Sequence, residues 1–232
     1  MLDKELIKNK FQKSIATYSK NAVVQQKIAQ KLSGYINGNF DNILEIGSYS
    51  GLLTKEIIKN TSFKSYLAVD IVNSFDYIKD LSPKIKFKLC DIEEEDLHEK
   101  FDLIISSSSL QWCSDFNSVI KKLKSYLMPN GQLIIAIFGE KNLYQIKEVF
   151  GVSLNYPNIA NIKKMFSSSA LIFEEVHTIS FSTSYELLKH LKYTGVNSFR
   201  NNFTYSQIKE KMKILENNFQ NKLTYNPLYI ID

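Results

Sequence analysis

The sequence predicts an α/β protein built on a doubly wound, mostly parallel sheet. Short apolar runs alternate with helical patterns through the first two thirds of the chain, as repeated strand–helix units do. The ends of four predicted strands carry polar side chains: Glu45, Asp70, Asp91 and Ser106. Because ligands of such sheets bind beyond the carboxyl ends of the strands, we expect a binding site at this edge.

Length and composition fit one soluble globular domain. The chain has 232 residues, of which 44% are hydrophobic and 23% are charged, and this supports a single substantial core. We expect one domain over 1–232, with an N-terminal helical cap over 1–37 and helices over 141–220 interleaved with the sheet. No apolar run approaches a membrane span, and Cys90 and Cys113 have no metal or redox spacing. We therefore expect a cytoplasmic protein, a monomer, with no metal site and no membrane contact.

The basic residues give the chain a formal net charge of +5. Arg200 is the single arginine among 29 basic residues, and the lysines are spread along the sequence, mostly on predicted helix faces. A nucleic-acid site would favour clustered charges and arginine, so solvated surface is the simpler interpretation and no nucleic-acid partner is expected. A mild excess of lysine would still suit an acidic protein partner.

The first 37 residues predict helix, either one or two broken near residues 19–21. Apolar and aromatic side chains from Phe11 to Leu32 recur at spacings of three and four and trace one stripe. Tyr18 and Gln25 lie on this inward stripe, and buried polar groups need partners. A ligand could be one of these partners, and packing on the core is the alternative.

The remaining pattern predicts the other elements. Strands are expected at 43–46, 65–70, 85–90, 101–106, 132–138, 170–181 and 223–231. Helices are expected at 52–58, 74–81, 115–127, 143–150, 158–167, 184–193 and 206–219.

The turn after the first strand is typical of a nucleotide-like cofactor site. Gly47 and Gly51 can adopt backbone angles closed to other residues, and the following helix presents free N–H groups. Such a turn alone is weak evidence. Asp70 strengthens it, because it ends the next strand about 20 residues later, where dinucleotide folds place a ribose-binding acid.

On these residues the sequence resembles the S-adenosylmethionine-dependent methyltransferases of the Rossmann-like class. Within that class it is most similar to the malonyl-acyl-carrier-protein O-methyltransferases of biotin synthesis, over nearly the whole chain. The segments that carry the similarity are 11–18, 22–25, 44–47, 91–93, 110–113, 191–195 and 223–225. The resemblance implies a Rossmann-like fold with an antiparallel last strand and a helical cover over the site.

The resemblance also implies a cofactor, S-adenosyl-L-methionine, and residues that hold it. These are Tyr18, Gln25, Glu45, Gly47, Ser48, Gly51, Asp70, Ile71, Asp91, Ile92 and Ser106. A carboxylate accepts the two hydrogen bonds of a ribose diol well, which independently favours Asp70. Asp91 could equally cap a helix or form a turn.

One position departs from the family pattern, because the family loop has a glycine where this chain has Tyr49. We expect this side chain to point away from the cofactor or to pack over it. The change leaves open a non-catalytic methyltransferase-like module, and an enzyme acting on another small carboxylic acid is a further alternative.

The implied reaction methylates the free carboxylate of a malonyl thioester on an acyl-carrier protein. A carboxylate is ionised at neutral pH and needs no general base, so we expect surface roles for His98, His177 and His190. Tyr18, Ser107 and Arg200 are the candidates for positioning the substrate, although Arg200 could also be an ordinary surface residue. Trp112 is expected either in the core or in a pocket wall.

Overall fold

The computed structural model describes residues 3–36, 38–196 and 203–232. Its main sheet has seven strands in the order β3-β2-β1-β4-β5-β9-β6. These strands are β1 (Asn39–Ile46), β2 (Ser62–Asp70), β3 (Ile85–Leu89), β4 (Phe101–Ser107), β5 (Leu127–Phe138), β6 (Leu171–Glu174) and β9 (Pro227–Ile231). β1 to β5 pair in parallel, and β9 runs antiparallel to both of its neighbours. The doubly wound sheet with an antiparallel last strand is confirmed.

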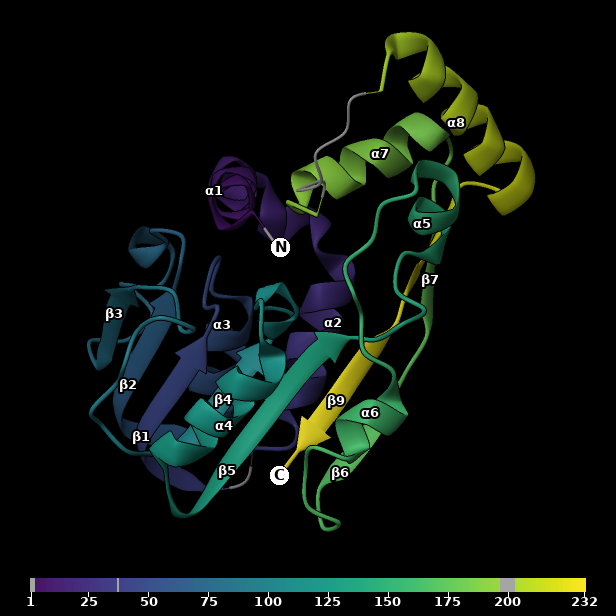
Figure 1. Ribbon diagram of the computed structural model, residues 1–232. Coiled ribbons are helices and arrows are strands. Elements are labelled where there is room, and N and C mark those ends of the chain that lie inside the picture. The colour runs from purple at the N-terminus through teal and green to yellow at the C-terminus, as the bar shows by residue number, and fades with distance from the viewer. Residues whose placement is uncertain (1–2, 37, 197–202) are drawn as a thin grey trace.

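Helices cover both faces of this sheet (Figure 1). They are α1 (Lys4–Asn21), α2 (Val23–Ser33), α3 (Leu52–Asn60), α4 (Phe116–Tyr126), α5 (Tyr144–Phe150), α6 (Ile159–Lys163), α7 (Ser184–Tyr193) and α8 (Tyr205–Phe219). The central strands are apolar on both faces, and alternate residues enter different cores. Ile43 of β1 packs with α2 and α3, whereas its neighbour Leu44 packs with α4 and α6.

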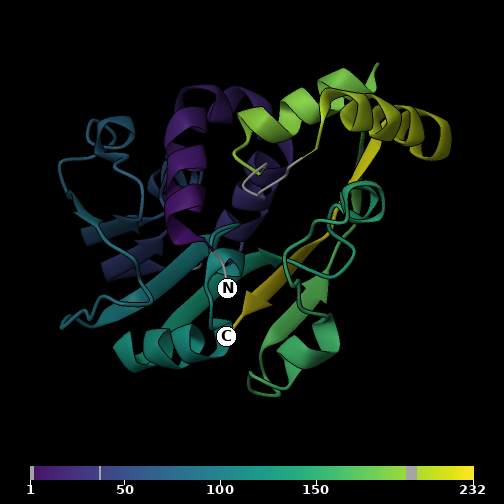
Figure 2. The same cartoon turned by 45° about the horizontal axis from the view of Figure 1, so that its top comes forward.

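The N-terminal segment forms two helices rather than one. α1 ends and α2 begins at Ala22, whose backbone angles (φ −82°, ψ 52°) are not helical. α2 packs on the sheet, whereas α1 lies over the ends of the strands beside α7 (Figures 1 and 2). The Thr17 hydroxyl donates to the Tyr193 carbonyl at 3.2 Å and joins these two helices. The break thus turns α1 into a cover above the predicted edge of the sheet.

Two expected strands are each divided between two sheets. The segment after Ala170 forms β6 and then β7 (His177–Ser180), and the last segment forms β8 (Lys222–Tyr225) and then β9. β7 and β8 pair with each other in a separate two-stranded sheet. Both breaks occur at one place, where the buried Asn226 amide donates to the Glu175 carbonyl at 2.8 Å.

The helix expected at 74–81 is wrong. The structure has only a 3₁₀ turn, Phe75–Tyr77, with the Tyr77 and Ile78 N–H groups bonded three residues back. The eight residues before Pro83 can form too few helical hydrogen bonds to offset the free-energy cost of nucleating an α-helix.

Candidate functional site

A cavity with an empty volume of about 910 Å³ lies at the predicted edge of the sheet, beneath α1. The predicted site residues that line it are Tyr18, Gln25, Gly47, Ser48, Asp70, Ile71, Asp91, Ile92 and Ser107. Sequence reasoning did not select Lys4, Ser50, Ser108 or Ser109, which also line it. The serine run 106–109 after β4 was a usable signal, whereas nothing in the sequence pairs Lys4 with this edge.

Three predicted site residues, Glu45, Gly51 and Ser106, do not line the cavity. Glu45 is fully buried, and its Oε2 accepts hydrogen bonds of 2.6 Å from the Thr54 and Tyr66 hydroxyls. The Ser106 hydroxyl donates to the Ile46 carbonyl at 2.9 Å, which ties β4 to β1. These contacts make Glu45 and Ser106 supports of the strand ends.

The glycine turn needs glycine for two reasons. Gly47 and Gly51 both have φ of +76°, where most side chains are strained. A Cβ on Gly47 would lie 2.2 Å from the Ser109 hydroxyl oxygen, and one on Gly51 would lie 2.9 Å from Ile78 Cγ2. Gly47 therefore lets the loops after β1 and β4 meet at the cavity. Gly51, the residue before α3, can lie close to Ile78 because it has no side chain.

Asp70 is held in place by backbone donors. Its Oδ2 accepts from the Tyr49 N–H at 2.9 Å and its Oδ1 accepts from the Val72 N–H at 2.8 Å. Burial raises the pKa of Asp70 to about 6, which these backbone bonds partly oppose. Each carboxylate oxygen can accept two hydrogen bonds, so both keep capacity for a ligand hydroxyl.

Tyr49 packs over the loop and fastens it to α1. It is a non-glycine residue with φ of +39°, and only 8% of its surface is exposed. Its ring contacts the rings of Phe11 and Tyr18 edge to face, with centroids 5.4 and 4.7 Å away. Its hydroxyl donates to the Phe11 carbonyl at 2.6 Å and lies 3.0 Å from the Ser14 hydroxyl. The side chain that replaces a glycine is thus a contact between the loop and its cover.

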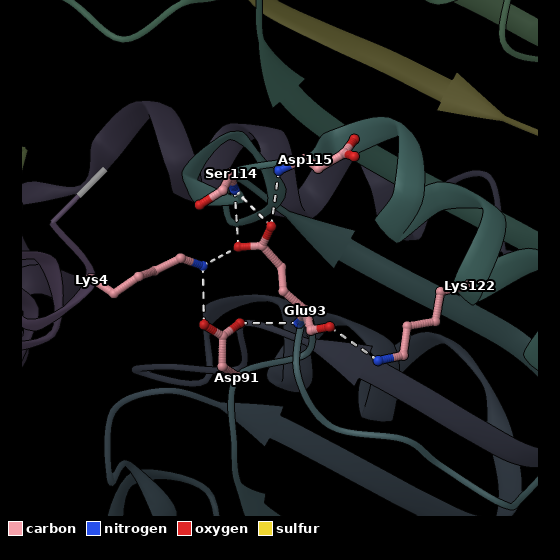
Figure 3. Close-up of polar contacts among 6 residues, drawn as sticks. All are labelled: Lys4, Asp91, Glu93, Ser114, Asp115 and Lys122. Atoms are coloured by element: carbon pink, nitrogen blue, oxygen red, sulfur yellow. Dashed lines mark hydrogen bonds and ion pairs between the residues drawn. The ribbon is translucent and has the colours of Figure 1, made fainter. Parts of the chain in front are cut away.

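A charged cluster fastens the other end of α1 (Figure 3). Lys4 pairs with Asp91 at 3.0 Å and also with Glu93, while Glu93 accepts from the Ser114 and Asp115 N–H groups. Burial opposes the charge on Lys4, but the bonds to Glu93 and Asp91 outweigh it and raise its pKa. The cluster joins α1 to the loops after β3 and before α4.

Other predicted residues fall in different places. Trp112 lies in the cavity wall with its ring edge to face with Phe11. His190 is 8% exposed and not a surface residue, because its ring packs beside Phe181 and bonds to Tyr225. Arg200 lies outside the described residues.

Residues 44–133 match a family model described as a methyltransferase domain. A malonyl-[acyl-carrier protein] O-methyltransferase of Calditerrivibrio nitroreducens is 34% identical, over 97% of this chain and 94% of the relative. The chain belongs to this family. The malonyl-[acyl-carrier protein] O-methyltransferase of Haemophilus influenzae is 31% identical, over 99% of this chain and 94% of its own length.

Solved structures show the same fold as this malonyl-[acyl-carrier protein] O-methyltransferase family member. A putative methyltransferase from Bacillus halodurans superposes with a TM-score of 0.63 at 12% identity, covering 88% of this chain and 96% of the other. An N-methyltransferase from Bradyrhizobium japonicum, in complex with S-adenosyl-L-homocysteine, gives a TM-score of 0.51 at 14% identity, covering 90% of this chain and 87% of the other. The Rossmann-like methyltransferase fold predicted from the sequence is confirmed.

The cavity wall fits a polar cofactor. Buried side-chain atoms without a partner among the described residues include Gln25 Oε1, Ser48 Oγ, Ser50 Oγ and Ser108 Oγ, which all belong to residues of this wall. Buried polar groups normally have partners, so four such atoms around one cavity indicate a ligand that supplies them.

Proposed function

We propose that this chain methylates the free carboxylate of a malonyl group carried on an acyl-carrier protein, with S-adenosylmethionine as donor. The observation that carries the proposal is the membership of the malonyl-[acyl-carrier protein] O-methyltransferase family over nearly the full chain. The residues around the cavity support it, because they fit the donor. From the resemblance we further propose that the product enters biotin synthesis in the cytoplasm.

The cavity beneath α1 would hold the cofactor. Asp70 would accept hydrogen bonds from the ribose hydroxyls, and Asp91 with Ile92 would contact the adenine. Ser48 beside Gly47 would contact the methionine part, and Tyr18 with Gln25 would cover it from α1 and α2. Glu45, Gly51 and Ser106 would act through the loop and strand ends that they support.

The main catalytic task of the protein in this reaction is to align the reacting atoms. When bound, the cofactor supplies a sulfonium methyl group, so that an O–CH₃ bond forms as the S–CH₃ bond breaks, the electron pair stays on sulfur and no proton moves. The side chains need only exclude water and hold the carboxylate oxygen in line. No general base is required, because a carboxylic acid of ordinary pKa, near ~4, is ionised at neutral pH.

The charge distribution supports an acidic partner above the site. α1, which covers the cavity, and the helices beside it, α7 and α8, carry ten lysines and four glutamates, a net charge of +6, while the whole chain carries +5. The rest of the molecule therefore has a net charge of −1. Ten of the lysines that look dispersed in the sequence thus belong to three helices that lie together on one side of the molecule (Figure 2). Such a surface speeds encounter with an acidic carrier protein.

Turnover with a series of acceptors tests the function. We expect methyl transfer to malonyl-carrier protein, weaker transfer to succinyl-carrier protein, and none to acetyl-carrier protein, which has no free carboxylate. Transfer to none of them, with intact cofactor binding, would refute the proposed substrate. A chain that binds no S-adenosylmethionine in calorimetry would be a non-catalytic module.

The partner is tested separately by charge reversal on the cover. Lys13→Glu combined with Lys192→Glu, both on exposed positions, should lower kcat/KM on malonyl-carrier protein and flatten its salt dependence. Lys55→Glu on α3, away from the cover, is the matched control. Equal losses on malonyl-pantetheine, which has the malonyl carboxylate but no carrier protein, would argue against a carrier-protein surface here.

A further inference from the structure

A smaller inner chamber, with an empty volume of about 330 Å³, adjoins the cofactor cavity. The two spaces share the side chains of Phe11, Tyr18, Gln25, Ser108 and Trp112. A ligand in one therefore lies next to a ligand in the other. Under the proposed function, on which this inference rests, the inner chamber is where an acceptor would meet the methyl group.

Three tyrosines from distant parts of the chain line this chamber. Tyr18 comes from α1, Tyr156 from the loop after α5, and Tyr225 from the end of β8. Burial raises the pKa of Tyr18 and of Tyr225, and each is raised further by the next phenol, Tyr225 for the first and Tyr156 for the second. The three side chains line the same chamber, and the raised pKa values, that of Tyr156 included, keep them as neutral O–H groups.

A buried histidine controls the innermost hydroxyl. His190 Nε2 lies 2.7 Å from the Tyr225 hydroxyl oxygen, and burial lowers the pKa of His190 to about 4. The imidazole is therefore neutral at physiological pH. With its proton on Nε2 it donates to Tyr225, which leaves the tyrosine O–H free to donate into the chamber.

Charged side chains are absent from the part of the chamber wall that the structure describes. Besides the phenols, the wall offers Ser108 Oγ, a buried hydroxyl that has no partner among the described residues and can donate. The buried Gln25 Oε1 and Gln111 Oε1 also lack partners there, but as amide oxygens they only accept hydrogen bonds. The neutral hydroxyls of the three tyrosines and of Ser108 thus line the part of this small space that the structure describes, and no charged side chain lies among the described lining residues.

We propose that Tyr18, Tyr156 and Tyr225 form a neutral receptor for the acceptor carboxylate, in which His190 directs the Tyr225 hydroxyl. The three O–H groups donate hydrogen bonds to the carboxylate and fix its position beside the cofactor. Its counter-charge in this space is the sulfonium. Tyr18, at the boundary of both spaces, contacts both ligands.

Neutral donors suit this reaction better than a cation would. The carboxylate loses negative charge as it attacks, so a lysine or arginine on it would stabilise the ground state more than the transition state. Hydrogen bonds from neutral phenols also hold the carboxylate oxygen in line, and they stabilise the ground state over the transition state less than a cation would. Methyl transfer neutralises the negative carboxylate and the positive sulfonium, and a space without water favours this loss of charge.

Removing single hydroxyls tests the receptor. Tyr225→Phe and Tyr156→Phe should each reduce kcat/KM on malonyl-pantetheine by roughly 10- to 100-fold, as expected for a hydrogen bond to a charged group. The dissociation constant for S-adenosylmethionine should stay within about twofold, because these two residues line only the inner chamber. The matched control is Tyr229→Phe, a buried tyrosine of β9 whose hydroxyl contacts Glu175 instead and which should keep wild-type kinetics.

A binding measurement supplies a readout that does not depend on turnover. Calorimetry of malonyl-pantetheine with the enzyme saturated with S-adenosylhomocysteine should show weaker binding in both chamber variants and unchanged binding in Tyr229→Phe. His190→Leu should resemble Tyr225→Phe, whereas His190→Gln, which keeps a donor, should restore part of the affinity.

The outcomes separate this inference from the proposed function. If the wild type methylates no malonyl thioester, the proposed function fails. If it is active and both phenylalanine variants keep wild-type affinity and kcat/KM, the receptor is overturned. Loss of acceptor affinity in Arg200→Gln together with unchanged chamber variants would assign the carboxylate to Arg200.

Discussion

Replacing Tyr49 by phenylalanine should loosen α1 from the cofactor loop without unfolding the protein. The change removes the bond to the Phe11 carbonyl and the contact with the Ser14 hydroxyl, and it keeps the ring. At about 0.5–1.5 kcal/mol for each hydrogen bond, the docking of α1 should weaken by about 1–3 kcal/mol. This corresponds to roughly a 5- to 150-fold larger population in which α1 is open.

Amide hydrogen exchange measures this opening directly. Exchange in α1 should accelerate by that factor in Tyr49→Phe, while the central strands β1 and β4 stay protected. Dissociation of S-adenosylmethionine should accelerate in parallel, because the cover over the cavity opens more often. Tyr205→Phe on the exposed face of α8, where Tyr205 is 75% exposed, is the control.

Tyr49→Gly makes a sharper comparison. It relieves the positive φ but also removes the two edge-to-face contacts, which contribute about 0.5–1.5 kcal/mol each. We expect α1 to open more than in Tyr49→Phe and the cofactor to bind less tightly than in the wild type. Unchanged α1 exchange in both variants would refute this reasoning. A wild type that binds no cofactor while Tyr49→Gly does would mean that Tyr49 has disabled an ancestral enzyme.

Two further substitutions test the strand-end carboxylates. Asp70→Ala should weaken S-adenosylmethionine binding by about 1.5–3 kcal/mol in calorimetry, since a charged acceptor of ribose hydroxyls is lost; undiminished affinity would remove this assignment. The second substitution, at Glu45, tests stability. Burial raises the pKa of Glu45 from 4.5 to about 7. Between pH 4.5 and pH 7 the folded chain therefore keeps a proton that the unfolded chain releases. Stability should therefore fall as pH rises through this window, and Glu45→Gln should reduce the fall by on the order of 1–3 kcal/mol in urea unfolding at pH 5 and pH 8. Asp70 contributes in the same direction and remains in the variant, so an identical fall in both proteins would contradict the role given to Glu45.

Much of the fold and of the cavity beneath α1 follows from local pattern. Apolar strands that end in Glu45, Asp70 and Asp91, with glycines at the first turn, require only the rule that parallel strands end at one edge. The helical stripe of the first 37 residues also selected Tyr18 and Gln25, which line the cavity from α1 and α2.

The rest depends on contacts between distant segments. The breaks after β6 and β8 arise from Asn226, whose bond to Glu175 spans 51 positions of the sequence. The pairing of Lys4 with Asp91 joins the first helix to the third strand, and no local signal predicts it. The sequence analysis expects a surface role for His190, since a carboxylate acceptor needs no general base, yet Phe181 and Tyr225 bury this side chain. The inner chamber has the same origin, since its three tyrosines come from three separate segments.

The position of the transferred methyl group tests the central claim most directly. Malonyl-carrier protein would be incubated with S-adenosylmethionine labelled with ¹³C on its methyl group, and the product examined by NMR and intact mass. The account predicts one added methyl group on the malonyl unit, as an ester of its free carboxylate, that mild alkali removes. A label on carbon, on the carrier polypeptide, or on no product at all would contradict it.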